Sequence, residues 1–161
     1  MALFQDIYQE YGRPVYRFLL SLTGDAGQAE ELMQETFYQA FLHCEQFEGR
    51  SSVYTWLCQI GKNAWLKECR RQKHFADLDV ITDICSEKRE QPEELAVRTE
   101  ELHRIRKAVY ELEEPYREVF IMRIFGESQL KDIAAAFGKS ESWARVTFYR
   151  AKNKIAEQIQ K

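Results

Sequence analysis

The sequence predicts an all-α protein of two small helical domains joined by an acidic linker, the C-terminal one being a helix-turn-helix domain. Apolar residues recur at helical spacing in several segments, and no segment alternates convincingly as a half-buried strand does. Residues 76–97 lose the helical period and are rich in carboxylates. With 161 residues, 45% of them hydrophobic, the chain can form one medium domain or two small ones.

Three helices are predicted in the first domain, residues 1–75. The first covers residues 3–22 and ends at Gly24, and Asp25 then caps a second amphipathic helix. A third helix begins at Ser51 or Ser52 and ends in a basic stretch. The apolar face expected to be buried in the second helix consists of Ala29, Leu32, Met33, Thr36, Phe37, Ala40 and Phe41.

The second domain, residues 98–161, follows the linker 76–97. Helicity resumes from about Glu94 to Leu112, and Pro115 fits the first position of another helix, which Gly126 ends. Ser128 or its neighbours begin a short helix that Gly138 breaks, and Ser140 caps the last one. Two helices joined so tightly cross steeply, which is typical of a helix-turn-helix.

The helix after Ser140 has two distinct faces. Its buried stripe is predicted to contain Ala144, Phe148, Ala151, Ile155 and Ile159. The opposite face mixes cations with residues able to meet base edges, as a helix in a DNA major groove does. An ordinary helical hairpin and a solvated surface helix remain alternatives. The candidate duplex-binding residues are Ser142, Arg145, Val146, Tyr149, Arg150, Lys152 and Lys154, with Asn153 on the same face.

Charge is segregated along the chain, although its net value is only −3. Residues 1–75 carry −1, residues 76–97 carry −5 and residues 98–161 carry +3, with especially basic runs at 62–74 and 139–161. This pattern predicts nucleic-acid contact at two separate places. Residues 49–73 also join aromatic side chains to cations, as surfaces for single-stranded DNA do. Trp56 is expected in the core, and Phe47, Tyr54 and Trp65 fit either role.

Three segments together resemble a known family. The order AEELMQETFYQAF, SSVYTWLCQIGKNAWLKECRR and then YREVFIMRIFGESQLKDIAAAFGKSESWARVTFYRAK is similar to the extracytoplasmic-function sigma factors, the small two-domain branch of the sigma-70 family of RNA polymerase subunits. The resemblance implies a promoter-specificity factor in which region 2, here residues 1–75, binds the β′ clamp helices and the melted −10 element. Region 4, here residues 98–161, would bind the β flap and read the −35 duplex.

The resemblance also assigns residues. The clamp-binding positions fall on Glu30, Glu31, Gln34 and Glu35, where a carboxylate-rich face suits a basic partner. The −10 positions fall on the loop 47–52 and on the basic helix that follows it, the same segment that carries the aromatic residues noted above. The −35 reader is the helix from Glu141. The candidate −10 residues are Phe47, Arg50, Ser51, Tyr54, Lys62, Asn63, Lys67, Arg70 and Arg71.

The chain departs from the family at two places. The family commonly has Ala-Arg-Asn where Gly61, Lys62 and Asn63 stand, and Leu-Pro where residues 112–115 read Leu-Glu-Glu-Pro. Lysine keeps the charge but lacks the bidentate fork of arginine, so the base preference at −10 is open. The family further implies control by an anti-sigma factor, often membrane-anchored, and a bacterial cytoplasmic location.

Other classes of function predict different sequence features. A helix-turn-helix regulator independent of polymerase would need no single-strand aromatic residues, and a helical protein adaptor would not need two basic segments. The spread of the three histidines and the lack of a phosphate loop or nucleophile elbow argue against an enzyme. The four cysteines have no C-x-x-C spacing, so no metal or cofactor is expected. No signal peptide or membrane-spanning run is predicted.

Overall fold

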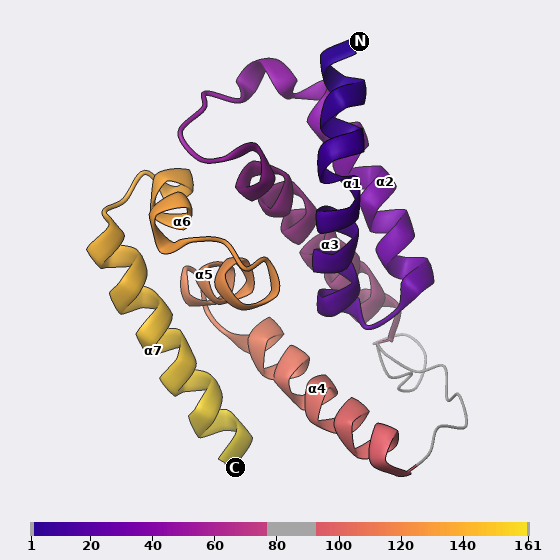
Figure 1. Ribbon diagram of the computed structural model, residues 1–161. Helices are drawn as coiled ribbons and strands as arrows, with labels where there is room; N and C mark the ends of the chain where they lie inside the picture. The colour runs from indigo at the N-terminus through magenta and orange to yellow at the C-terminus, as the bar shows by residue number, and fades with distance from the viewer. Residues whose placement is uncertain (1, 77–92, 161) are drawn as a thin grey trace.

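The computed structural model describes residues 2–76 and 93–160. The first half contains α1 (Ala2–Thr23), α2 (Ala26–Leu42), the short 3-10 turn η1 (Cys44–Gln46) and α3 (Val53–Ala76). These three long helices pack side by side as a bundle (Figure 1). The prediction of three helices before residue 75 is confirmed.

The second half contains five helical segments, and most of the predicted linker lies outside the described residues. α4 (Glu93–Glu111), α5 (Tyr116–Phe120) and η2 (Ile121–Phe125) lead to α6 (Leu130–Phe137) and α7 (Glu141–Gln160). α7 runs past α4, α5 and α6, all of which it contacts (Figure 1). No described residue is in a strand, so the all-α prediction is confirmed.

The predicted helix ends depend on local side-chain chemistry, and most are confirmed. The Gln28 amide donates to Asp25 Oδ1 at 2.8 Å, and the Thr55 amide donates to Ser52 Oγ at 3.1 Å. Each bond satisfies an N-terminal amide that the helix itself leaves without a partner. Gly24 follows α1 with a φ of 71°, a left-handed conformation that glycine adopts without steric cost.

The segment from Tyr116 to Gly126 differs from the single regular helix predicted for it. Its second half, η2, is a π-helical turn in which the Gly126 amide donates to the Ile121 carbonyl at 3.0 Å. Such wide turns are rare and occur mostly as single turns inside α-helices. The start of α6 is as predicted for Ser128 or its neighbours, since the adjacent Gln129 occupies the cap position, with no side-chain bond.

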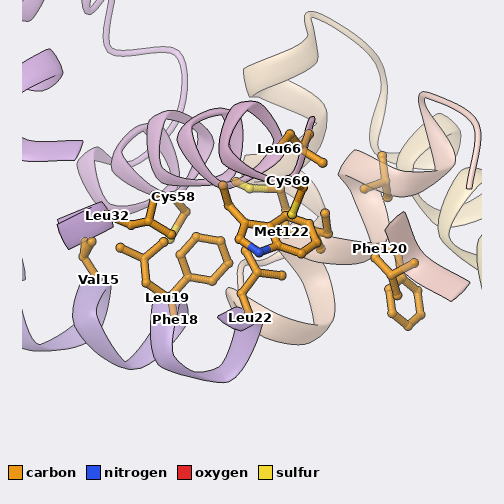
Figure 2. Packing of buried hydrophobic residues seen from close by; sticks show 14 of the residues in the cluster. Val15, Phe18, Leu19, Leu22, Leu32, Cys58, Leu66, Cys69, Phe120 and Met122 are labelled. Atoms are coloured by element: carbon orange, nitrogen blue, oxygen red, sulfur yellow. The ribbon is translucent and has the colours of Figure 1, made fainter. Parts of the chain in front are cut away.

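One hydrophobic core runs through both halves of the molecule. Figure 2 shows Met122, from η2, among buried side chains of α1 and α3 such as Phe18, Leu22 and Cys69. Met122 and Ile121 are fully buried. The two predicted domains are therefore packed against each other in this structure, and this contact determines which candidate site residues reach solvent.

Candidate nucleic-acid interface

α6 and α7 form a tight helix-turn-helix. Gly138 ends α6 in the left-handed conformation, with a φ of 65°. The Lys139 amide donates a hydrogen bond to the Ala134 carbonyl at 2.9 Å. The Trp143 amide then donates to Ser140 Oγ at 3.1 Å, which confirms Ser140 as the cap of α7. A glycine turn and a capping serine thus fix the direction in which α7 leaves the turn.

The seven duplex-binding candidates on α7 are all exposed. Two of them are apolar in whole or in part, yet Val146 is 47% exposed and Tyr149 is 63% exposed. The buried face consists of Ala144, Thr147, Ala151 and Ile155, so the predicted stripe is right at three positions. Phe148 is only half-buried and stacks on Phe120 at 6.0 Å. Ile159, in the last turn, is 45% exposed, so its predicted burial is wrong.

Three cations on α7 have defined positions. Lys154 Nζ lies 5.0 Å from the ring centre of Tyr116, and Lys152 Nζ lies 5.6 Å from that of Phe148. Both ammonium groups thus lie near aromatic rings, and both lysines are exposed. Arg145 Nη2 is 3.4 Å from Glu141 Oε1, a surface pair of little energetic weight. The face can therefore offer its positive charge to phosphates.

The candidate single-strand surface begins in the loop before α3. Phe47 is half-buried, with its ring 5.0 Å from that of Trp56 and tilted by 39°. Arg50 is exposed and pairs with Glu48 at 2.8 Å, and Ser51 Oγ donates to the Ser52 carbonyl at 3.3 Å. Trp56 is itself half-buried rather than a full core residue, while Trp65 is the buried tryptophan of α3. Phe47 of the loop and Trp56 of α3 thus form one aromatic pair, and the same loop carries the exposed cation Arg50.

The C-terminal part of α3 is basic and open to solvent. Asn63, Lys67, Arg70 and Arg71 are all exposed. The Arg71 guanidinium donates to both carboxylate oxygens of Glu68, at 2.6 and 3.0 Å, and these hydrogen bonds lower the pKa of Glu68. Glu68 and Arg71 are three residues apart, a spacing that favours such a pair on a helix, but the pair was not among the predictions.

Two candidates, Lys62 and Tyr54, are not open to solvent in this way. The Lys62 side chain is 1% exposed, and its Nζ lies 2.9 Å from Glu118 Oε1 on α5. Burial lowers the pKa of Lys62, and the hydrogen bond to Glu118 opposes that effect. The Tyr54 hydroxyl donates to the Gly126 carbonyl at 2.8 Å. Both residues therefore contact the second half of the chain instead of presenting their polar ends to water.

The polymerase-binding candidates share one face of α2. Glu30, Glu31, Gln34 and Glu35 are all exposed. The next turns add exposed apolar side chains that sequence reasoning missed, since Tyr38 is 57% exposed and Phe41, predicted to be buried, is 47% exposed. The Phe41 ring contacts that of Phe4 at 5.2 Å. Helical period predicts which face a residue lies on, and not whether a neighbouring element covers that face near the helix end.

The cysteines do not form a metal site in the described part of the chain. Cys44 is exposed, Cys58 and Cys69 are buried as free thiols, and Cys85 lies outside the described residues. Burial raises the pKa of Cys58 to about 12. Within residues 2–76 and 93–160 no cluster of three or more metal-ligating side chains occurs, and none of the helices there is long and apolar enough to cross a bilayer.

Comparison with protein families finds two matches that divide the chain in the same way as its two halves. A family model described as sigma-70 region 2 matches residues 7–75. A second, described as sigma-70, region 4, matches residues 102–155. The region 4 match contains α6 and most of α7, and the region 2 match contains α2 and all but the last residue of the basic helix α3.

Curated relatives extend the likeness over almost the whole chain. The ECF RNA polymerase sigma factor SigM of Bacillus subtilis is 30% identical over 151 residues, which cover 93% of this chain and 91% of the relative. SigX of the same organism is 31% identical, covering 91% and 78%. The RNA polymerase sigma factor YlaC is 27% identical, covering 98% and 92%.

Solved structures share the fold. CnrH in complex with the cytosolic domain of CnrY matches with a TM-score of 0.61 at 20% identity, covering 98% of this chain and 87% of that one. The sigma factor RpoE of Bartonella quintana, solved with the anti-sigma factor NepR, matches with a TM-score of 0.59 at 21% identity, covering 97% and 98%. At these identities the likeness establishes the fold alone.

Proposed function

Because this chain belongs to the extracytoplasmic-function sigma factors of RNA polymerase, we propose that it grips one promoter at two places, through α7 on paired DNA and through α3 on unpaired DNA. As a member of that family it is a promoter-specificity subunit that binds core polymerase and directs transcription initiation. We assign residues 1–75 to region 2, residues 76–97 to the linker and residues 98–161 to region 4.

The −35 contact is assigned to the outward face of α7, and one observation carries this assignment. That face exposes Val146 and Tyr149 between basic side chains, and between Glu141 and Glu157 the helix has no carboxylate. Exposed apolar groups suit thymine methyl groups in the major groove, and the cations suit the phosphates. The assigned residues are Ser142, Arg145, Val146, Tyr149, Arg150, Lys152 and Lys154.

The −10 contact is assigned to the loop before α3 and to α3 itself. An exposed basic track beside aromatic rings fits a strand whose bases are free to stack. The exposed part of this surface is Arg50, Asn63, Lys67, Arg70 and Arg71, and Phe47 and Ser51 are half-buried beside it. Tyr54 and Lys62 join it only when the second half moves away.

Partners follow from the charges of the remaining surfaces. We assign the acidic face of α2, with Glu30, Glu31, Gln34 and Glu35, to the β′ clamp helices, and region 4 to the β flap. The fold relative RpoE was solved with an anti-sigma factor, which supports an anti-sigma partner here, membrane-anchored as is common in the family. A cytoplasmic location and the lack of a catalytic role belong to the same proposal.

Experiments with reconstituted polymerase can test the −35 and the −10 contacts separately. Core polymerase and the protein would first select a promoter from genomic fragments by run-off transcription. Arg145→Ala and Tyr149→Ala should then weaken the DNase I footprint at −35, whereas Arg70→Glu with Arg71→Glu should keep that footprint and abolish strand opening. Arg17→Glu, an exposed charge reversal on α1 outside both assigned surfaces, is the control. Equal behaviour of all variants would refute the assignment.

A further inference from the structure

The contact between the two halves uses residues assigned to unpaired DNA. Lys62 and Tyr54 both lie on α3, and both bond to the segment α5–η2 and the residue that follows it, at 2.9 Å to Glu118 and 2.8 Å to the Gly126 carbonyl. Thr55, next to Tyr54, is 3.4 Å from the Ser128 hydroxyl. Three polar contacts thus join the first half of α3, between Tyr54 and Lys62, to region 4.

We propose that the free protein is self-inhibited, with the Glu118 carboxylate occupying at Lys62 the place that a DNA phosphate takes when the −10 strand is bound. This inference rests on the function proposed above and adds a regulatory contact to it. Glu118 and a phosphate oxygen are both anionic acceptors, and an ammonium buried against one is not accessible to the other. The closed and the DNA-bound arrangements of Lys62 therefore exclude each other.

The ion pair is suited to a switch rather than to a permanent clamp. Taking the Lys62 ammonium out of water costs about as much as its pairing with Glu118 returns, so the pair adds little net stability while it is intact. Removing the carboxylate alone leaves an uncompensated buried charge, which strongly disfavours the closed form. The Phe137 ring, 5.9 Å from Lys62 Nζ, covers the same ammonium and would move away with α6.

Apolar packing supplies the attraction that keeps the halves together. Met122 is fully buried in a core shared with α1 and α3, and Figure 2 shows it among their side chains. Opening returns that side chain to water, which disfavours the open form. Apolar packing around Met122 thus stabilises the closed form, and the loss of either charge of the Lys62–Glu118 pair destabilises it. Core polymerase, which binds both regions in the proposed function, supplies the compensating contacts.

The test compares the full-length protein with charge variants of this pair. Glu118→Gln should increase the radius of gyration measured by small-angle X-ray scattering, with unchanged helicity by circular dichroism. It should also bind a fluorescent single-stranded −10 oligonucleotide about 10- to 100-fold more tightly in the absence of polymerase, if the open form is about 1 to 10% populated in the wild type. Glu113→Gln makes the same charge change at an exposed neighbour and should do neither.

A charge swap keeps the proposal testable if a single variant fails to fold. Lys62→Glu combined with Glu118→Lys restores opposite charges, so it should restore compaction but not oligonucleotide binding. Unchanged size and affinity in Glu118→Gln would overturn the inference even where the wild-type holoenzyme opens its promoter. A holoenzyme that opens no promoter would instead overturn the proposed function, and the scattering result would still report whether the pair closes the chain.

Discussion

Gly24 has a left-handed backbone conformation and also lies against Arg106 of the second half. Its replacement by alanine should therefore destabilise the protein in two separable ways, through backbone strain and through the loss of the Arg106 contact. Its φ of 71° lies in the left-handed region, where a residue with a Cβ loses about 1–2 kcal/mol. The Cβ would also come within 2.7 Å of Arg106 Nη1. That guanidinium on α4 donates twice to the Ser21 carbonyl at the end of α1, at 2.9 and 3.2 Å. Because the arginine end is flexible, it would swing away rather than clash.

The two costs predict a total for Gly24→Ala. Losing a partly solvated arginine contact adds about 1 kcal/mol to the strain, less than the range for buried charged hydrogen bonds. We therefore expect Gly24→Ala to lower the free energy of unfolding by about 2–3 kcal/mol. Gly138→Ala is the matched control, because its φ is 65° but no atom lies within 4 Å of the added Cβ, and it should cost only the strain, about 1–2 kcal/mol.

Urea unfolding followed by circular dichroism gives both values, and a double mutant isolates the contact. With Arg106→Ala in the background, Gly24→Ala should lose only what Gly138→Ala loses, a coupling of about 1 kcal/mol. If Gly24→Ala and Gly138→Ala destabilise the protein equally, or if the coupling is zero, Arg106 does not join α4 to α1 as described.

Three further outcomes follow from local chemistry. Ser140→Ala removes the acceptor of the Trp143 amide and should cost about 1 kcal/mol of stability, seen as a lower Tm in a calorimetric scan. At pH 8, iodoacetamide should modify exposed Cys44 while sparing Cys58, because a pKa of about 12 leaves on the order of one thiolate in ten thousand; mass spectrometry would contradict this by finding equal labelling of the native protein. Lys152→Gln should reduce the salt dependence of promoter binding, log K against log salt concentration, by about 0.9, and an unchanged slope would remove Lys152 from the phosphate contacts.

Sequence reasoning is strongest where short-range rules decide the structure. Asp25 and Ser140 cap their helices as predicted, and Gly24 and Gly138 adopt the left-handed turns, because each depends on neighbours within a few residues. The exposed face of α7 follows from helical period for the same reason. The resemblance to sigma factors rests on three such segments occurring together.

The remaining features depend on contacts far apart in the chain. Tyr54 and its partner Gly126 are separated by 72 positions, and no local pattern pairs Lys62 with Glu118. A lysine beside Asn63 in a basic run therefore predicts a solvent-facing DNA contact, and only the packing of the second half of the chain against α3 shows it buried and paired with Glu118. The π-helical turn η2 likewise lies in the core shared by both halves, where Ile121 and Met122 within it are fully buried.

Potassium permanganate footprinting of a promoter selected by the reconstituted holoenzyme tests the central claim most directly, because it reports unpaired thymines. Reactive thymines should appear around −10 only when core polymerase and this protein are both present, on templates that are also protected at −35. The absence of added reactive thymines, or the same reactivity with core polymerase alone, would contradict the claim that this chain holds one promoter in both its paired and its unpaired form.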